Sequence, residues 1–235
     1  MNDFGQDILQ GLERVAVERA ARAADPALAA RVAAVKLFQH ARFAHTYDDL
    51  MGDARYRRAT AFFLDDLYGP SDFSLRDTQF ARIVPALVRL FPREIVGTVA
   101  QLSALHALSE KLDSAMGRNI ADGPITGTRY GSAWRAVSEP ALRERQIALM
   151  LSVGTALDRY TRNPLLRNTL RLMRGPAHAA GLGALQISGE WLREFPSHAR
   201  RSGVPGHHRA ARAGSGAAAV LGQGCTGSAA GLMPG

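Results

Sequence analysis

The sequence predicts an all-α protein, with a single-domain, antiparallel, bundle-like fold of about eight helices followed by a tail. Apolar residues recur at intervals of three and four through the first 186 residues. The strict alternation of apolar and polar residues that is typical of a half-buried strand does not recur. An acidic residue or asparagine stands directly before proline at several points, which is typical of a helix start. After Gln186 this periodicity ends. We therefore expect a helical domain over residues 1–186 and a tail over residues 187–235.

Two helices are expected in the first fifty residues. Apolar residues from Ile8 onward predict a first helix that runs to about Ala24. Asp25 and Pro26 then open a second helix, because aspartate caps a helix and proline is tolerated at the first helical position. The apolar pattern of this second helix continues to about Tyr47.

The next two helices are expected on either side of a tight turn. A third helix is predicted over residues 53–67, and the Gly-Pro-Ser sequence at residues 69–71 ends it. Ser74 heads a fourth helix, which contains Pro85. Because proline lacks a backbone N–H and clashes with the preceding turn, Pro85 is expected to kink this helix or to begin a new segment.

The second half of the domain is expected to hold four more helices. Pro92 opens the fifth helix, whose apolar stripe repeats regularly through Leu112. Residues 117–131 are expected to form a loop because glycine and proline interrupt them. The remaining helices are predicted to start at Glu139-Pro140 and end near Tyr160, to start at Asn163-Pro164 and end at Gly175-Pro176, and to start at Ala177.

Composition excludes several classes of protein. The net charge is +8, of which +5 belongs to residues 1–186, and 27 of the 29 basic residues are arginine. The only cysteine is Cys225, so the helical domain has neither disulfides nor cysteine-based metal or catalytic sites. The N-terminus lacks the pattern of a signal peptide, and the longest nearly apolar stretch, residues 147–157, is too short for a membrane span of about 20 residues. We expect a soluble, cytoplasmic protein without membrane contact.

Common catalytic and nucleotide-binding motifs are absent from the sequence. The helical domain has no Gly-x-Ser-x-Gly nucleophile elbow and no phosphate-binding loop with its lysine. The short Gly-Leu-Gly sequence at residues 181–183 follows no predicted strand, so it does not indicate a dinucleotide site. We therefore expect no cofactor, and whether the protein is an enzyme stays open.

The densest local pattern is residues 56–77, YRRATAFFLDDLYGPSDFSLRD. Its charged residues could surround the turn and bind a hard cation or a basic partner. In the simpler interpretation the aromatic residues pack in the core, Asp72 or Ser74 caps the next helix and Arg76 pairs with an acid. The spacing matches no calcium-binding loop. The candidate site residues of this segment are Asp65, Asp66, Asp72, Arg76 and Asp77.

In this segment the chain resembles a family of uncharacterised bacterial helical proteins with the signature FFLxDLYGPxDFxxRD. The resemblance continues through IVPALVRLFPREIV, LHALSEKLD, RQIALMLSVGTALDRYTRNPLLRNTLRLMRGPA and GLGALQ, and so covers roughly residues 50–186. It implies an all-helical fold. It implies no activity, cofactor or catalytic residue.

The tail looks like a coding sequence read in the wrong frame. It contains 10 of the 23 glycines and no aspartate. Read one base later within the Gln186 codon, with free choice of synonymous codons, residues 186–214 can give RFLESGCASFRRTPGGAEFLATIERRERA. The resembling family continues with segments similar to RFLExG and FLATIExRE, which this string contains. The alternative is a genuine disordered tail, rich in glycine and basic residues, that cannot form a core.

A second candidate site lies on the fifth predicted helix. His106, Glu110 and Asp113 stand at positions i, i+4 and i+7 and therefore share one helix face. Nitrogen and oxygen groups of this kind can bind a metal ion if another element supplies a further ligand. The paired Glu-x-x-His and the His-Glu-x-x-His motifs are absent, which favours a hydrogen-bonded core histidine instead.

The function therefore stays open between three hypotheses. The first is a binding or regulatory module that acts through helix faces or an inter-helix pocket, with a protein partner or a second copy of the chain as possible partners. The alternative is a metal-binding protein or enzyme that uses His106, Glu110 and Asp113 with the turn between Asp65 and Asp77. A second alternative is nucleic-acid binding through an arginine ridge from Arg159 to Arg174, in which one helix face carries Arg167, Arg171 and Arg174.

Overall fold

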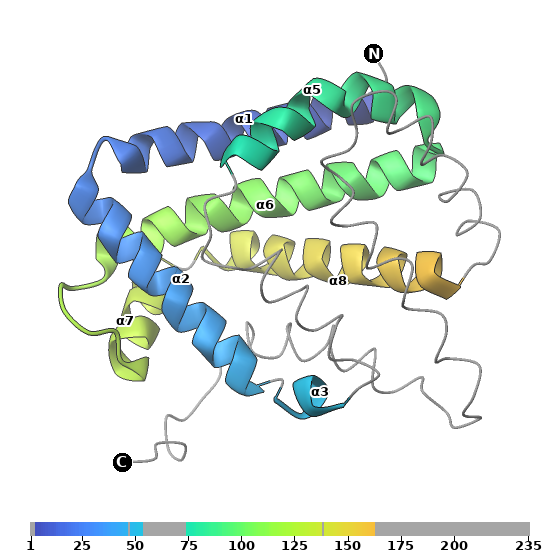
Figure 1. Cartoon of the computed structure of the whole chain (residues 1–235). Helices are drawn as coiled ribbons and strands as arrows, with labels where there is room; N and C mark the ends of the chain where they lie inside the picture. The colour runs from blue at the N-terminus through green and yellow to red at the C-terminus, as the bar shows by residue number, and fades with distance from the viewer. Residues whose placement is uncertain (1–2, 47, 54–73, 138, 163–235) are drawn as a thin grey trace.

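The computed structural model describes residues 3–46, 48–53, 74–137 and 139–162. All regular structure in these residues is α-helical, which confirms the predicted fold class. Figure 1 shows the arrangement of the helices. Their bounds are α1 Asp3–Ala23, α2 Pro26–Thr46, α3 Asp48–Gly52, α5 Ser74–Leu90, α6 Arg93–Asn119, α7 Gly127–Val137 and α8 Pro140–Arg162.

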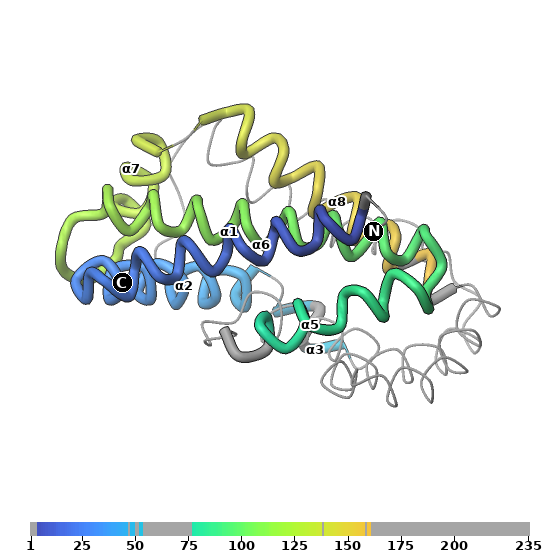
Figure 2. The backbone as a smooth tube through the Cα atoms, turned by 90° about the horizontal axis from the view of Figure 1, so that it is seen from above, coloured from blue at the N-terminus to red at the C-terminus, as the bar shows by residue number. Residues whose placement is uncertain are grey.

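Helix α6 is the centre of the fold. It contacts α1, α2, α5, α7 and α8, and in Figures 1 and 2 it runs along the length of the molecule. Phe4 lies beside Gly97 and Arg22 bonds to Ser114, so α1 and α6 run parallel. Tyr160 bonds to Thr98 and Gln146 to Ser109, so α8 runs antiparallel to α6. The bundle is thus of mixed direction around α6.

The predicted helix starts agree with the local structure. Asp25 caps α2, because its Oδ1 accepts a hydrogen bond of 3.0 Å from the backbone N–H of Leu28. Helix α2 begins at Pro26 and α8 begins at Pro140, positions where a missing N–H costs no hydrogen bond. Helix α6 begins directly after Pro92 and ends at Asn119, followed by Gly123 with a φ of 105°.

One predicted loop has wrong bounds, and one of the two alternatives for Pro85 is excluded. The loop expected over residues 117–131 is shorter, because α6 continues to Asn119 and α7 starts at Gly127. Glycine and proline at residues 123–127 concealed the pattern of α7, whose buried residues Tyr130, Ala133 and Trp134 follow a helical spacing. Pro85 does not begin a new segment, because α5 runs through it as one helix.

Several other expectations fall mainly or wholly outside the described residues. The helix predicted over residues 53–67 has only its first residue within them. The short helix α3, which the sequence did not predict, precedes it. The predicted helices that start at Asn163 and Ala177 also lie beyond the described part of the chain, as does the tail.

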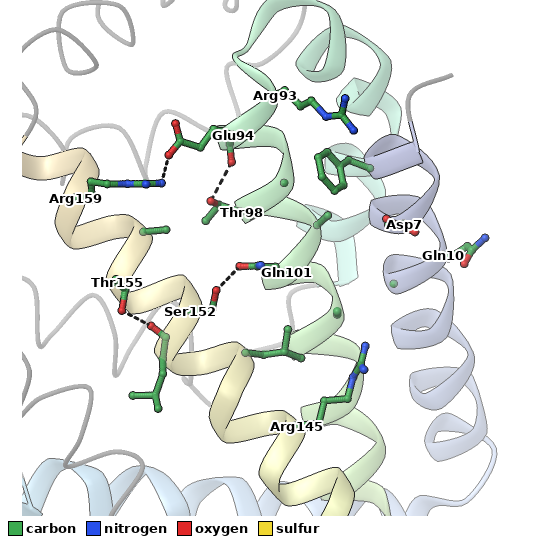
Figure 3. Close-up of a pocket in the computed structure, with 18 of the residues that line it drawn as sticks. Asp7, Gln10, Arg93, Glu94, Thr98, Gln101, Arg145, Ser152, Thr155 and Arg159 are labelled. Atoms are coloured by element: carbon green, nitrogen blue, oxygen red, sulfur yellow. Dashed lines mark hydrogen bonds and ion pairs between the residues drawn. The ribbon is translucent and has the colours of Figure 1, made fainter.

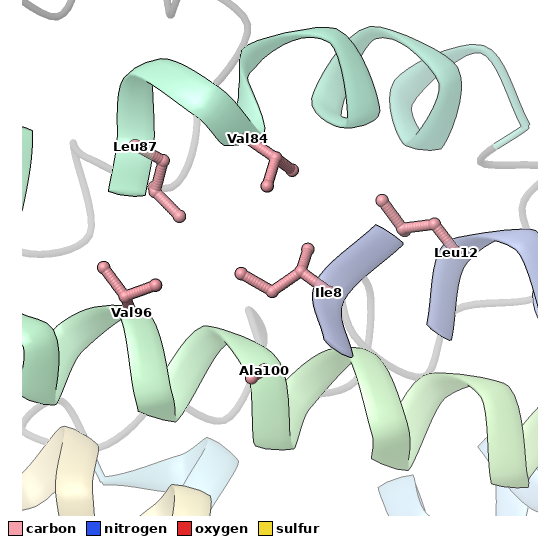
Figure 4. Packing of buried hydrophobic residues seen from close by; sticks show 6 residues of the cluster. All are labelled: Ile8, Leu12, Val84, Leu87, Val96 and Ala100. Carbon is pink, nitrogen blue, oxygen red and sulfur yellow. The ribbon is translucent and has the colours of Figure 1, made fainter. Parts of the chain in front are cut away.

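Two apolar clusters hold the helices together. The first joins α1, α5 and α6 through Ile8, Leu12, Val84, Leu87, Val96 and Ala100, which face one another in Figure 4. The second joins α2, α6 and α7 around Met116 and Trp134. Each fully buried aliphatic side chain contributes roughly 1.5–3 kcal/mol through removal from water. These contacts fix α6 between its neighbours.

Close helix crossings depend on glycine at one buried position of α6. A Cβ atom on Gly117 would lie 2.5 Å from Cγ2 of Val32 and 3.3 Å from its backbone nitrogen. Gly117 therefore lets α2 approach α6 closely.

Within the described ranges, no helix is long and apolar enough to span a bilayer.

Candidate functional site

Charged side chains from four helices meet beside the core, and we call this set the Glu110 cluster. It joins α1, α2, α5 and α6 and consists of Arg19, Arg22, Lys36, Asp77, His106, Glu110 and Asp113. The sequence predicted the three residues on α6 as one polar face. The structure brings this face together with Asp77, the last residue of the 56–77 segment.

Glu110 is the most buried member of the cluster, with a side chain that is only 4% exposed. Its Oε2 accepts a bond of 2.5 Å from Nη2 of Arg22, and its Oε1 accepts one of 2.8 Å from Nζ of Lys36. Arg19 also donates to Oε1 at 3.3 Å. Three cations from two helices therefore surround one carboxylate, which is how a buried charge becomes tolerable.

Asp77 connects α5 to the same cluster. Its Oδ2 accepts a hydrogen bond of 2.8 Å from Nη1 of Arg19 and lies 3.1 Å from Nε2 of His106. The side chains of Asp77 and His106 are 15% and 24% exposed, so this side of the cluster is nearer to solvent than Glu110 is. Asp77 thus links three helices.

Asp113 occupies the other side of the cluster. Its Oδ1 accepts a hydrogen bond of 3.2 Å from the amide of Gln39, and its Oδ2 lies 4.0 Å from Nζ of Lys36. The same Gln39 amide lies 3.4 Å from the hydroxyl of Tyr130. Asp113 has one neutral donor and one distant cation, so it is less well compensated than Glu110.

These differences set opposite pKa shifts for the two carboxyl groups. Burial alone would raise the pKa of Glu110, but the charges and hydrogen bonds of Lys36 and Arg22 lower it to about 2. Burial raises the pKa of Asp113 to about 6, because Lys36 offsets only part of the desolvation and the charge of Glu110 adds to it. Burial also raises the pKa of Tyr130.

The cluster has the chemistry of a structural charge network. Its carboxylates already bind arginine and lysine, which occupy the positions that a cation would take. In the described part of the chain, no group of three histidine, cysteine or acidic residues has the geometry to hold a metal ion. The arrangement fixes α1, α2 and α5 against α6 and presents no evident nucleophile.

Sequence reasoning missed the basic half of this cluster. Arg22 lies seven residues after Val15 and fourteen after Ile8, so it continues the buried stripe of α1. An arginine in line with an apolar stripe was the available signal for a buried ion pair. Lys36 carried a weaker signal, because it follows the buried Val35 on α2 and is one of only two lysines in the chain.

Other predicted site residues fall outside this description. Asp65, Asp66 and Asp72 lie outside the described residues. Arg76 belongs to α5 by its backbone, but its side chain is likewise outside the description. Most of the proposed arginine ridge also lies beyond the described residues, namely Arg167, Arg171 and Arg174. Its first residue, Arg159, forms an ion pair with Glu94.

A groove on the other side of α6 is the second candidate site, and we call it the α1–α6–α8 groove. Figure 3 shows α6 as its floor, with α1 and α8 as the walls. The cavity volume is about 1070 Å³, slightly above the range of about 300–1,000 Å³ that is typical of ligand pockets. Small and apolar residues line much of it, including Phe4, Gly97, Ala104 and Leu149.

Charged residues are placed unevenly along this groove. At one end, Arg159 pairs with Glu94 and Arg93 lies over the ring of Phe4, with its Cζ 5.4 Å from the ring centroid. At the other end, Arg14 and Arg145 line the groove and are exposed. Neither of these two arginines forms a hydrogen bond or an ion pair with the part of the chain that the structure describes.

One family model matches the chain, over residues 18–188, and its description is domain of unknown function DUF8198. The chain belongs to this family. The DUF8198 range contains the whole Glu110 cluster and two of the three helices of the groove, whereas Phe4 and Arg14 on α1 precede it. Its end lies two residues beyond Gln186, where the composition changes. No curated protein and no solved structure matches this DUF8198 chain.

Proposed function

We propose that this DUF8198 protein is a helical ligand-binding module whose binding site is the α1–α6–α8 groove. The observation that carries the proposal is the cavity itself, an open space of about 1070 Å³ lined by small and apolar residues together with a few polar and charged ones. Ligand sites are typically concave, mostly apolar and marked by a few convergent polar groups. The groove has this composition.

The Glu110 cluster is better explained by stability than by binding. Glu110 and Asp77 form ion pairs with the cations of the cluster at distances of 2.5–3.3 Å, and Glu110 is nearly excluded from solvent. A ligand would have to replace these internal bonds. In the groove, by contrast, exposed side chains and small residues leave space for a ligand.

The test uses N-phenyl-1-naphthylamine, a neutral probe whose fluorescence rises in an apolar site. We expect the wild-type protein to bind this probe in the groove and Ala104→Trp to lose most of the binding, because tryptophan fills the floor. Ala33→Trp is the matched control, since Ala33 is exposed on α2 and does not line the groove. Equal binding by all three proteins, or no binding by the wild type, would reject the proposal.

We also propose that residues 187–235 are encoded out of the family's reading frame. The composition changes after Gln186, and the match to the family ends at residue 188, which supports this reading. Resequencing the coding DNA across the codons of residues 185–188 tests it. A gained base or two lost bases is the expected result, and an unaltered sequence would show that the tail belongs to the gene.

A further inference from the structure

The helix directions place Arg14 and Arg145 at the same level of the groove. Along the parallel pair α1 and α6, the Ser103 hydroxyl donates 2.9 Å to the carbonyl of Ile8, and Arg22 reaches Glu110. Arg14 lies between these two levels. On the antiparallel α8, Arg145 directly precedes Gln146, which bonds to Ser109 on α6 at 3.0 Å. The two arginines therefore stand on opposite walls between the levels of Ala104 and Glu110 on α6, and Figure 3 shows Arg145 pointing from α8 across α6.

This end of the groove carries two arginines that form no ion pair with a described residue. The acidic residues of the lining are Asp7 and Glu94. Glu94 pairs with Arg159 at the far end. Asp7 precedes Arg14 by seven residues on α1, a separation of about 10 Å along the helix axis. Two guanidinium groups that line one groove without an ion pair to a described residue are suited to an anion, because guanidinium donates paired hydrogen bonds to carboxylate or phosphate.

The rest of the groove is suited to the apolar part of a ligand. From Ala104 toward Arg93 the floor carries the small residues Ala100 and Gly97, beside Gln101 and Thr98, whose polar groups bond to Ser152 and Tyr160 of α8. Phe4 contributes an aromatic ring to the α1 wall. The twelve residues from Arg93 to Ala104 span about 16 Å of α6. An elongated molecule could lie along this floor with one end between the two arginines.

We infer that the groove selects an amphipathic anion, a molecule with a carboxylate or phosphate head group held between Arg14 and Arg145 and an apolar chain along α6. The inference rests on the proposed function, because it names the ligand class of the same groove. The head group is recognised by charge and the chain by removal of apolar surface from water.

Displacement of N-phenyl-1-naphthylamine by decanoate, decyl phosphate, decanol and inorganic phosphate tests the inference. We expect decanoate and decyl phosphate to displace the probe from the wild-type protein at lower concentrations than decanol does. In the double variant Arg14→Gln/Arg145→Gln, affinity for the two anions should fall about tenfold or more, because hydrogen bonds to charged groups are lost. The affinity for decanol should be the same in the double variant as in the wild-type protein.

Two further variants control for charge and folding. Arg82→Gln/Arg89→Gln removes the same charge from exposed positions of α5 and should leave the affinity for both anions unchanged. Arg14→Lys/Arg145→Lys keeps the charge and should retain most of the affinity. All variants should unfold at the wild-type temperature, since both arginines of the groove are exposed.

The outcomes separate this inference from the proposed function. One outcome would overturn the ligand class but keep the groove as the site. In it, Arg14→Gln/Arg145→Gln binds the anions as tightly as the wild type does, while Ala104→Trp loses probe binding. Inorganic phosphate that binds as tightly as decyl phosphate would also overturn the amphipathic class. Unchanged probe binding in Ala104→Trp would overturn both.

Discussion

Glu110 forms ion pairs with three cations, Arg19, Arg22 and Lys36. Replacement by glutamine keeps its size but removes the negative charge that Arg22 and Lys36 share. Because these cations would stay partly buried without a counterion, Glu110→Gln is expected to lower the free energy of unfolding by about 3–5 kcal/mol. Urea denaturation measures this. Glu13→Gln, at an exposed position of α1, is the control and should change stability by less than about 0.5 kcal/mol.

Asp113 should make stability depend on pH in the opposite direction to ordinary carboxylates. Its pKa is about 6 in the folded protein against an ordinary value of 3.8 for aspartate, so the folded state binds its proton more tightly than the unfolded state does. Stability from this group is therefore present below about pH 4 and is lost as pH rises to about 6, by up to about 3 kcal/mol. Glu110 has a lowered pKa and contributes stability that is lost only as pH falls from about 4.5 toward 2.

Asp113→Asn separates these two contributions. Thermal unfolding of the wild type and the variant is compared at intervals from pH 4 to pH 7. We expect the wild type to lose stability relative to Asp113→Asn as pH rises through this range, because only the wild type must ionise a buried carboxyl group. A constant difference between the two proteins would show that the pKa of Asp113 is not raised.

At the scale of helices, two glycines should respond oppositely to the same substitution. Gly117→Ala places a methyl group 2.5 Å from Cγ2 of the buried Val32, so we expect the free energy of unfolding to fall by about 1–3 kcal/mol despite better helix propensity. Among the described residues, no atom lies within 4 Å of the Cβ position of Gly154 in α8, so Gly154→Ala should stabilise by roughly 0.5–1 kcal/mol. Chemical denaturation of both variants tests the pair, and the same sign for both would contradict the packing described here.

The sequence pattern predicted where individual helices begin better than it predicted which helices pack against one another. The starts of α2 and α8 follow from local rules, because an acidic residue before proline determines them without help from the rest of the fold. Helix α7 was missed because its Tyr130, Ala133 and Trp134 are buried by α2 and α6, and a pattern of eleven residues beside glycines carries little local signal. Pro85 stays within α5 because the packing of Val84 and Leu87 against α1 and α6 outweighs a broken helical hydrogen bond.

At the scale of the whole molecule, both candidate sites depend on contacts between distant segments. His106, Glu110 and Asp113 could be grouped from their spacing on one helix, but their partners on α1 and α2 are more than seventy residues away. The position of the groove could not be predicted, because Arg14 and Arg145 are placed on its opposite walls only by the directions of α1 and α8 along α6. Local periodicity contains no information on these directions.

Chemical-shift mapping with decanoate is the measurement that would show whether ligands bind in the α1–α6–α8 groove. Amide spectra of the full chain would be recorded as decanoate is added. We expect the largest shifts at residues that line the groove, such as Gly97, Ala104 and Ser152, and small shifts on α2. Shifts centred on the Glu110 cluster or on α2 and α7, or no saturable shifts at all, would contradict the account.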